Sequence, residues 1–558
     1  MSACAGSDHC RFICPGRARE GLSPRRSIYE MSMILPARGK DHFYGGPMLQ
    51  IKHLSFTHRQ DLRTLLKDFN LVLNPGDRAV IVGEEGNGKS TLLKWIYDPA
   101  LVESYVEAEG ECVRDGRTAY LPQELPERER TLSVYACFSE MESFWNAGHR
   151  ELRLLARELG LPQEIFYSEQ SMGSLSGGER IKLSMARLLL EKPDILLLDE
   201  PSNDIDIETL EWLERQITAF PGIVLFISHD ETLIERTANQ VILLEQLHRK
   251  SVSRWTVANM PYAQFVEQRR RGFEKQEQMA YSERREERAA LERFRRIQQR
   301  VEHEQRTISR RDPSGGRLLK KKMASVKATE RRYEREHAEM TEIPVSEDAI
   351  NVKLNYQRPL PAGRVVLELE MPELRAPDGR LLSRDLKLHV QGPEKLCIIG
   401  RNGAGKSTLL RQIRSLLKAR ENLHVCYMPQ DYNELLDPAQ TPVDFLAPSG
   451  DKAAVTEARS FLGAMHYTTQ EMERPLGELS GGQRAKVLLL KLGLTETDVL
   501  LLDEPTRNFS PLSGPEIREM LRAFPGAILA VSHDRKFIAE VCDRVLILTE
   551  NGLEAQRP

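Results

Sequence analysis

The chain has 558 residues, with 79 Lys and Arg against 82 Asp and Glu, and 40% of its residues are hydrophobic. This length and composition are typical of a soluble protein of three or four domains. The longest apolar runs, such as Ile195 to Leu198 and Val499 to Leu502, have the length of strands. None approaches the roughly 20 residues that cross a bilayer, which excludes a helical membrane protein.

Residues 1–47 differ from the rest because Arg, Pro and Gly are frequent and no periodicity is visible. They contain a cluster of possible metal ligands, Cys4, His9, Cys10 and Cys14. A zinc knuckle is disfavoured because the spacing lacks a second pair of ligands. A secretory signal is disfavoured because the segment has no sustained apolar core. Met48 opens an alternating strand, so we expect the true start at Met48, Met31 or Met33, with a leader that is disordered or not made.

The remaining cysteines are scattered through apolar segments without paired spacing: Cys112, Cys137, Cys397, Cys426 and Cys542. Cysteines in such positions behave as small hydrophobic residues of a reducing compartment. We therefore expect a cytoplasmic protein.

A phosphate-binding loop follows the first strongly apolar strand, Ala79 to Val82. The sequence Gly83-Glu-Glu-Gly-Asn-Gly-Lys89-Ser90 fits G-x4-G-K-[ST] in the strand-loop-helix context that this pattern requires. Its glycines let backbone N–H groups face phosphates, while Lys89 neutralises β/γ-phosphate charge and the Ser90 hydroxyl ligates Mg²⁺.

Two carboxylates emerge from a second buried strand, in Ile195-Leu-Leu-Leu-Asp199-Glu200-Pro201. A continuous aliphatic run is typical of a parallel strand buried on both faces, and its carboxyl end lies where such sheets bind ligands. Asp199 is expected to orient Mg²⁺, and Glu200 to align the attacking water or accept its proton. Surface acids are a weaker reading, because everything before them in the strand is buried.

The segment after residue 345 repeats this series. Gly400-Arg-Asn-Gly-Ala-Gly-Lys406-Ser407 follows the strand Leu396 to Ile399, and Val499-Leu-Leu-Leu-Asp503-Glu504 corresponds to the second strand. Leu-Ser176-Gly-Gly-Glu and Leu-Ser480-Gly-Gly-Gln each read as a capping box that opens a helix able to meet a phosphate. The spacings coincide, because 23 residues separate each of these serines from its strand-end Asp, and 30 more reach His229 and His533. The two halves are copies of one domain.

Between the copies, residues 261–340 contain almost no Gly or Pro except around Asp312 to Gly316. Apolar residues at heptad-like spacing predict a helical hairpin zipped along a seam of Phe294, Ile297, Val301, Ile308, Leu319, Met323, Val326, Tyr333, His337 and Met340. Phe265 to Met340 holds 22 Lys or Arg against 14 Asp or Glu, although the whole chain carries −3. Acids near the root can pair with the bases, but the tip has too few to do so. We therefore expect a phosphate-contacting surface at Arg310, Arg311, Arg317, Lys320, Lys321 and Lys322.

The two copies resemble ATP-binding cassette domains, with Walker A, a Q-loop glutamine, an LSGGQ-type signature, Walker B and a switch histidine. Two cassettes flanking a charged hairpin, with no membrane domain, resemble the ABC-F subfamily of translation factors and ribosome-protection proteins. The predicted fold is thus α/β, with two tandem ATP-binding cassette (P-loop NTPase) domains at 48–258 and 346–558, joined by an α-helical coiled-coil hairpin linker at 259–345. The resemblance implies that the cassettes close head-to-tail on two ATP molecules. It also implies that the hairpin enters the ribosome towards the P-site tRNA and 23S rRNA.

The resemblance carries functional roles to matching positions. The catalytic residues would be Glu200, Glu504, His229 and His533. Residues expected to bind ATP are Gly83, Gly86, Asn87, Gly88, Lys89, Ser90, Thr91, Gln123, Ser176, Gly177, Gly178, Gly400, Asn402, Gly403, Gly405, Lys406, Ser407, Thr408, Gln430, Ser480, Gly481 and Gly482. Those expected to hold Mg²⁺ are Ser90, Gln123, Asp199, Ser407, Gln430 and Asp503. The first site would combine the Walker A of the first cassette with the signature of the second cassette. The second site would combine the Walker A of the second cassette with the signature of the first.

Two departures from the family pattern stand out. The loop after Glu200 keeps its final acid, Asp206, but the corresponding loop of the second cassette ends in Ser510, so the two sites are expected to differ. The aromatic residue that stacks on adenine is also unclear. His58 and Phe56 are weak candidates in the first cassette, and the second offers none.

Spacing indicates a minimal member of the subfamily. Gln123 to Ser176 spans 53 residues and Gln430 to Ser480 spans 50, which leaves no room for an added helical arm. Only 25 residues follow His533, so we expect no C-terminal extension, and we expect a monomer that pairs its own cassettes.

Two other functions are alternatives to ribosome binding. An ATPase subunit of a transporter would give the basic hairpin no role, and a DNA-associated ATPase would usually have a longer coil or zinc-binding cysteine pairs. Within the ribosome hypothesis, a general factor for stalled translation and protection against an antibiotic both remain open. The compact tip, which lacks a large apolar finger, slightly favours the general role.

Overall fold

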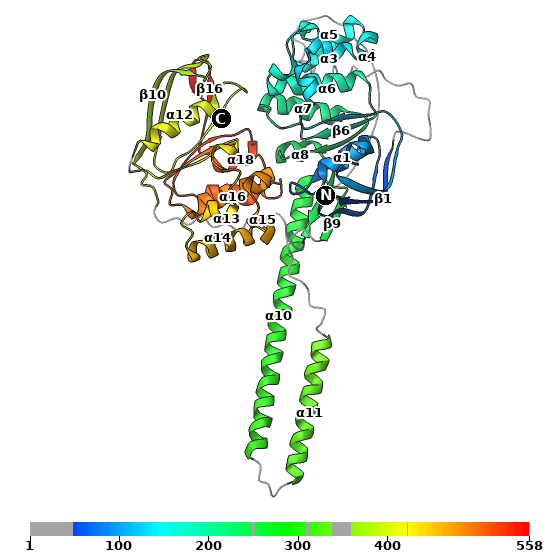
Figure 1. The fold of residues 1–558 in the computed structure, drawn as a ribbon, viewed down its shortest axis with the longest axis vertical. Helices are drawn as coiled ribbons and strands as arrows, with labels where there is room; N and C mark the ends of the chain where they lie inside the picture. The colour runs from blue at the N-terminus through cyan, green and yellow to red at the C-terminus, as the bar shows by residue number, and fades with distance from the viewer. Residues whose placement is uncertain (1–47, 248–251, 308–312, 337–358, 421, 557–558) are drawn as a thin grey trace, which may run out of the picture. The chain divides into compact units, whose positions relative to one another are not determined.

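The computed structural model describes residues 48–247, 252–307, 313–336, 359–420 and 422–556 (Figure 1). Tyr44 to Pro558 belong to one compact unit. The predictions made for residues 1–47 lie outside the described residues, as do Arg310, Arg311 and the seam positions Ile308, His337 and Met340. In the part of the chain that is described, no helix combines the length and apolarity needed to cross a bilayer.

The first cassette is built on a six-stranded sheet in the order β5-β6-β7-β3-β8-β9. All neighbouring strands run parallel except β8 and β9, which are antiparallel. The strands are β3 (Arg78–Val82), β5 (Thr118–Leu121), β6 (Ile195–Asp199), β7 (Ile223–Ile227), β8 (Gln240–Gln246) and β9 (Val252–Ala258). A smaller antiparallel sheet, β2-β1-β4, comprises β1 (Leu49–His58), β2 (Thr64–Leu73) and β4 (Val106–Arg114).

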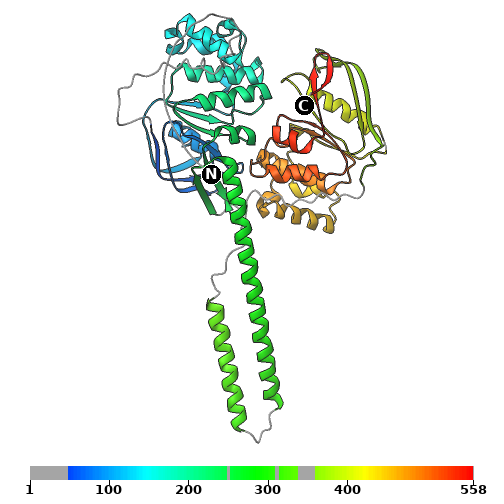
Figure 2. The same ribbon diagram turned by 180° about the vertical axis from the view of Figure 1, so that it is seen from behind.

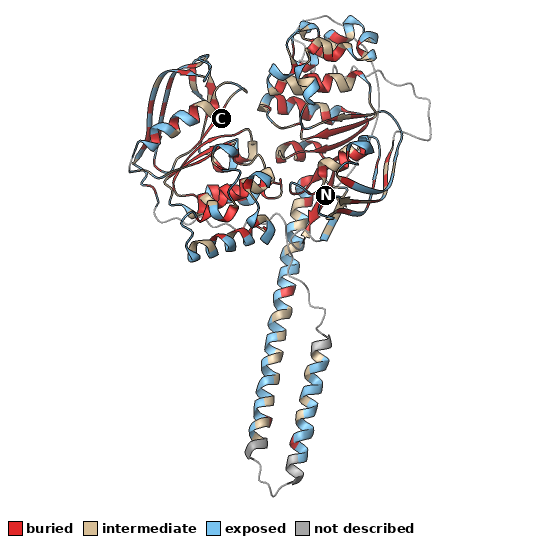
Figure 3. Cartoon of the chain, in the orientation of Figure 1, coloured by how far each residue is buried: buried red, intermediate tan, exposed pale blue. Residues whose placement is uncertain are grey.

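Helices cover both faces of the six-stranded sheet, and β6 shows this directly. Its Leu196 and Leu198 belong to one core cluster, whereas Ile195 and Leu197 belong to the cluster on the opposite face. The sheet strands are accordingly buried (Figure 3). The helices are α1 (Lys89–Tyr97), α2 (Glu127–Thr131), α3 (Val134–Ser139), α4 (Glu142–Asn146), α5 (His149–Leu159), α6 (Gly177–Leu190), α7 (Ile207–Ala219) and α8 (Glu231–Thr237), with 3₁₀ turns η1 (Pro99–Leu101), η2 (Gln163–Tyr167) and η3 (Met172–Ser174). Burial on both faces explains why β6 reads as a continuous aliphatic run.

The second cassette repeats the architecture with the order β13-β14-β15-β12-β16-β17, beside a two-stranded sheet of β10 and β11. Its strands are β10 (Val365–Arg375), β11 (Leu381–Gln391), β12 (Lys395–Ile399), β13 (Val425–Met428), β14 (Val499–Asp503), β15 (Ala527–Val531), β16 (Arg544–Thr549) and β17 (Gly552–Ala555). Its helices are α12 (Lys406–Lys418), α13 (Pro442–Leu446), α14 (Lys452–Ala464), α15 (Thr469–Glu473), α16 (Gly481–Leu494), α17 (Gly514–Arg522) and α18 (Arg535–Val541), with 3₁₀ turns η4 (Tyr432–Glu434) and η5 (Leu476–Glu478). The matching strand orders confirm the repeat inferred from motif spacing.

The linker forms the expected hairpin of α10 (Tyr262–Thr307) and α11 (Pro313–Glu336), which run side by side in both views (Figures 1 and 2). Its root is anchored in the first cassette, because Tyr262 and Phe265 join the core cluster that contains α8. Arg269 of α10 also donates to Glu245 of β8 at 2.7 Å. The linker therefore continues directly from the folded body of the first cassette.

Contacts along the hairpin support most of the described seam. Val301 is fully buried, and the rings of Phe294 and Tyr333 meet across it at 5.9 Å. Ile297 was wrongly assigned to the seam, because 43% of its surface is exposed. One of the few acids near the tip, Glu304, lies 3.8 Å from Lys322 of the other arm.

Candidate ATP sites

The first phosphate-binding loop connects β3 to α1, and its shape depends on glycine. Gly83 has φ 153°, and a Cβ there would lie 2.3 Å from the carbonyl oxygen of Leu244. The Asn87 side chain donates to that same carbonyl at 3.0 Å, so the asparagine shapes the loop from the core side. Lys89 Nζ donates to the carbonyls of Gly83 at 2.8 Å and Glu84 at 2.9 Å, which holds the lysine head within the loop.

The strand-end carboxylate of the first cassette is held by two hydroxyl groups. Ser90 Oγ donates to one oxygen of Asp199 at 2.9 Å, and the hydroxyl of Tyr120 donates to the other at 3.1 Å. Sequence reasoning missed Tyr120. A signal for it exists, because Tyr120-Leu-Pro-Gln123 recurs as Tyr427-Met-Pro-Gln430.

Glu200 follows in a left-handed conformation, with φ 50°, which is uncommon for a residue other than glycine. Its carboxylate accepts hydrogen bonds from Gln123 at 2.9 Å and Asn203 at 2.5 Å, and lies 3.2 Å from His229 Nε2. Burial opposes ionisation, but the charge and hydrogen bond of His229 prevail and lower the pKa of Glu200 to about 2. The same pairing raises the pKa of His229 against the effect of burial. The first site therefore contains an ionised Glu200 carboxylate paired with His229.

The second site has the same residues in a different electrostatic state. Burial raises the pKa of Glu504 to about 8, and burial together with the charge of Lys406 lowers the pKa of His533 to about 4. The two side chains are 3.8 Å apart, too far for a hydrogen bond. Glu504 is thus protonated and His533 neutral at neutral pH. Glu504 shares the left-handed conformation of Glu200, with φ 52°.

Asp503, at the end of β14, is buried, and neither of its carboxylate oxygens has a hydrogen-bond partner among the described residues. Burial raises the pKa of this carboxyl. An orphaned buried carboxylate beside the phosphate-binding loop fits a bound cation, and Mg²⁺ commonly takes one or two protein oxygens together with substrate phosphates. Asp503 and Ser407 would hold the ion in the second site, as Asp199 and Ser90 would in the first.

The signature segments form the predicted capping boxes at the starts of α6 and α16. Ser176 caps α6 with Glu179, and Ser480 caps α16 with Gln483. Gly482 must be small, because a Cβ would lie 2.9 Å from the carbonyl oxygen of Asn508 in the loop after β14. The start of α16 meets an anionic group, because the Gly482 N–H donates to the Glu85 carboxylate.

Each phosphate-binding loop contacts the signature region of the other cassette. In the first site, Glu85 accepts a hydrogen bond from the Gly482 N–H, and Glu84 pairs with buried Lys486 of α16 at 2.9 Å. In the second site, a cavity of about 470 Å³ is lined by Lys406, Gln430 and Glu504 from one cassette and by Gly177 and His229 from the other. In both composite sites, the structure thus places a phosphate-binding loop of one cassette close to signature residues of the other.

The loops that follow the catalytic glutamates also cross between cassettes. His229 Nδ1 lies 2.7 Å from the carbonyl oxygen of Phe509, which places the loop ending in Ser510 against the first site, as expected. Asp206 interacts electrostatically with Lys406 and His533 of the second site. Ser510 is buried and cannot supply an equivalent charge to the first site.

One expectation about the aromatic residue that stacks on adenine is wrong. Phe56 is not an adenine platform, because it is buried in the core and packs edge-on against Trp95 at 5.7 Å. Instead, Arg380 lines the second cavity, and Arg63 donates to the Gly86 carbonyl of the first loop at 3.2 Å. Each arginine precedes the first glycine of its loop by 20 residues, a repeat that sequence reasoning missed.

Two segments, residues 66–203 and 383–507, match the family model described as "ABC transporter". Among solved structures, the chain resembles an archaeal ribosome recycling factor crystallised with a ribosomal stalk protein, with a TM-score of 0.54, 16% identity and 90% of each chain covered. The fold and these matches define the class: the protein is a tandem ATP-binding cassette ATPase, which uses ATP with Mg²⁺. When bound, ATP supplies the phosphoanhydride that is cleaved.

Curated relatives are similar along most of their length. The chain is 29% identical to the ribosome protection protein VmlR of Bacillus subtilis, covering 88% of this chain and 86% of the relative. It is 29% identical to the tylosin resistance ATP-binding protein TlrC of Streptomyces fradiae, covering 92% and 99%. It is 28% identical to the energy-dependent translational throttle protein EttA of Escherichia coli, covering 88% and 90%. The chain is thus similar, along most of its length, to curated proteins of the ABC-F subfamily.

Proposed function

We propose that this chain is a cytoplasmic, ribosome-binding ATPase. ATP draws each phosphate-binding loop and opposing signature together, this form presents the basic hairpin to the P-site tRNA and 23S rRNA, and hydrolysis releases it. The observation that carries the proposal is the long hairpin of α10 and α11, rooted in the first cassette and rich in exposed Lys and Arg near its tip. Similarity to a ribosome protection protein and a translational throttle protein supports this partner.

The proposal assigns roles to the site residues. Glu200 and Glu504 would align or deprotonate the attacking water, with His229 and His533 beside them. The phosphate-binding loops, the glutamines Gln123 and Gln430 and the opposing signature serines and glycines would hold ATP. The chain would act as a monomer that pairs its own two cassettes.

Ribosome co-sedimentation tests the proposal. The variant Glu200→Gln/Glu504→Gln should pellet with ribosomes when ATP is present, because it binds ATP without hydrolysing it. In the same background, alanine at Arg310, Arg311, Arg317, Lys320, Lys321 and Lys322 should abolish pelleting, since these bases supply attraction to the RNA backbone. Six bases nearer the hairpin root, changed together, form the charge-matched control: Arg270, Arg271, Lys275, Arg284, Arg285 and Arg288. If the hydrolysis-blocked variant binds ATP but stays in the supernatant, the ribosome is not the partner.

A translation assay distinguishes relief of stalled translation from protection against an antibiotic. Purified ribosomes are supplied with a stalling template or with an antibiotic that binds near the peptidyl-transferase centre, and synthesis is measured with and without the protein. The compact tip favours relief of the stall over relief of the drug. Rescue of the drug-inhibited reaction alone would assign the protein to antibiotic protection.

A further inference from the structure

Three pairs of equivalent positions in the two cassettes carry opposite charges. Two residues after the switch histidine, the first cassette has Glu231 and the second has Arg535. Seven residues after that histidine, the first has Arg236 and the second has Glu540. Six residues before the shared Phe-Pro-Gly sequence, the first has Glu214 and the second has Arg518. These positions lie in α7 and α8 of one cassette and in α17 and α18 of the other.

The reversed charges meet each other across the two cassettes. Arg518 of α17 binds Glu231 of α8 through two hydrogen bonds, at 2.6 and 3.2 Å. Arg535 of α18 donates to Glu214 of α7, and also to Asp230 at 3.3 Å. Because the two cross-pairs join equivalent positions, one is the pseudo-symmetric counterpart of the other with its charges exchanged.

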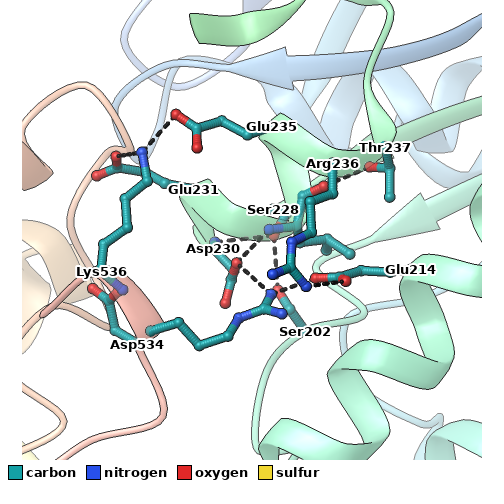
Figure 4. A network of polar contacts seen from close by, with 12 residues as sticks. Ser202, Glu214, Ser228, Asp230, Glu231, Glu235, Arg236, Thr237, Asp534 and Lys536 are labelled. Atoms are coloured by element: carbon teal, nitrogen blue, oxygen red, sulfur yellow. Dashed lines mark hydrogen bonds and ion pairs between the residues drawn. The ribbon is translucent and has the colours of Figure 1, made fainter. Parts of the chain in front are cut away.

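The third position completes the pattern within each cassette. Arg236 donates to Glu214 at 3.0 Å, and Arg518 donates to Glu540 at 2.8 Å, so the same pair occurs twice with opposite polarity. Figure 4 shows Glu214, Arg236, Glu231 and Lys536 within this network. Lys536 adds a further cross-cassette contact, to Glu231 at 3.0 Å.

The two cross-pairs are largely buried, which makes the choice of partner energetically important. The side chains of Arg518 and Glu231 are only 4% and 7% exposed. Gly514 makes room for this pair, because a Cβ there would lie 2.0 Å from the Glu231 carboxylate. A buried charge left without its partner is strongly destabilising. Two like charges placed against each other at an interface weaken association by several kcal/mol.

We propose that this charge arrangement selects a second cassette as the partner of the first and prevents either cassette from pairing with its counterpart in another copy. Pairing two first cassettes would set Glu214 against Glu231, and pairing two second cassettes would set Arg518 against Arg535. Discrimination of this kind uses repulsion against the wrong partner as well as attraction to the right one. The inference deepens the intramolecular pairing proposed above and does not depend on the ribosome.

Charge exchange in the full-length chain tests the proposal. The variant Glu214→Arg/Glu231→Arg/Arg236→Glu gives both cassettes the charges of the second, and Arg518→Glu/Arg535→Glu/Glu540→Arg gives both the charges of the first. Light scattering coupled to size exclusion should find each variant monomeric, with a larger hydrodynamic radius than the wild type because its cassettes no longer pair. Mixed in equal amounts, the two variants should form a complex of twice the monomer mass.

The six-fold exchange, made in one chain together with Lys536→Gln and Asp230→Asn, should restore the wild-type radius, because both cross-pairs between equivalent positions are re-formed with their charges exchanged and the charges of Lys536 and Asp230, which would repel them, are removed. This variant also decides the matter if either triple variant fails to fold. The control is Glu211→Arg/Glu191→Arg, which reverses two exposed acids of the first cassette and should leave the radius unchanged. The proposal is overturned if the triple variants keep the wild-type radius, if their mixture stays monomeric, or if the six-fold exchange fails to restore pairing. None of these results bears on whether the wild-type chain binds the ribosome, which the co-sedimentation experiment tests separately.

Discussion

If Glu200 and Glu504 act as the proposed bases, the two ATP sites should have different pH profiles. The variant Glu504→Gln leaves only the first site with a carboxylate base, and Glu200→Gln leaves only the second. With a pKa of about 8, Glu504 is roughly one-tenth ionised at pH 7 and nine-tenths at pH 9, so the activity of the Glu200→Gln variant should rise about tenfold over this range. With a pKa of about 2, Glu200 is ionised throughout this range, so the ATPase activity of the Glu504→Gln variant should stay nearly constant.

The assay is steady-state phosphate release at saturating ATP and Mg²⁺, from pH 6.5 to 9.5 at constant ionic strength. The double variant Glu200→Gln/Glu504→Gln supplies the background. Nucleotide binding measured at both ends of the range excludes a change in occupancy. Parallel profiles for the two single variants would refute the assigned difference between the sites.

The raised pKa of Glu504 also affects stability. Its folded-state pKa exceeds the ordinary value of 4.5, so the folded chain binds more protons and loses stability as the pH rises from 4.5 to about 8. Glu504→Gln removes this cost, and its Tm should exceed that of the wild type by an amount that grows across that window and then levels off. Glu200 has a lowered pKa and adds stability above 4.5 that is lost as the pH falls towards 2, so Glu200→Gln should lower the Tm at neutral pH. Calorimetry at several pH values checks both signs.

Two further substitutions test single contacts against matched controls. Tyr120→Phe removes the 3.1 Å hydrogen bond to buried Asp199 and should lower the free energy of unfolding by about 1 kcal/mol in urea titration. Tyr427→Phe should cost less, since the equivalent hydroxyl makes no hydrogen bond to the strand-end carboxylate of its own cassette; equal losses would contradict the assigned role of Tyr120. Val301→Ala, at a fully buried seam position, should cost about 1–2 kcal/mol and speed amide hydrogen exchange within the hairpin. Ile297→Ala, at a position 43% exposed, should leave exchange there nearly unchanged, and similar acceleration in both would place the seam elsewhere.

Local patterns were strong predictors of this fold. Serine followed three residues later by Glu or Gln forms the capping boxes at Ser176 and Ser480, because such a cap depends on neighbours along one helix. The aliphatic runs before Asp199 and Asp503 became strands buried on both faces. Equal spacing of motifs in the two halves predicted equal strand orders. The hairpin followed from periodicity, although Ile297 shows that periodicity alone does not fix every seam position.

The sequence by itself thus determined the two cassettes and the hairpin, because each depends on residues close together in the chain or on a repeat visible within it. Only the tertiary structure decided which contacts surround each ionisable group. Glu200 and Glu504 occupy identical motifs, yet their pKa values differ because Glu200 lies within hydrogen-bond distance of His229, whereas Glu504 is buried and 3.8 Å from His533. Likewise, the partners Glu231 and Arg518 are 287 residues apart, and their buried pairing exists only where two folded cassettes meet.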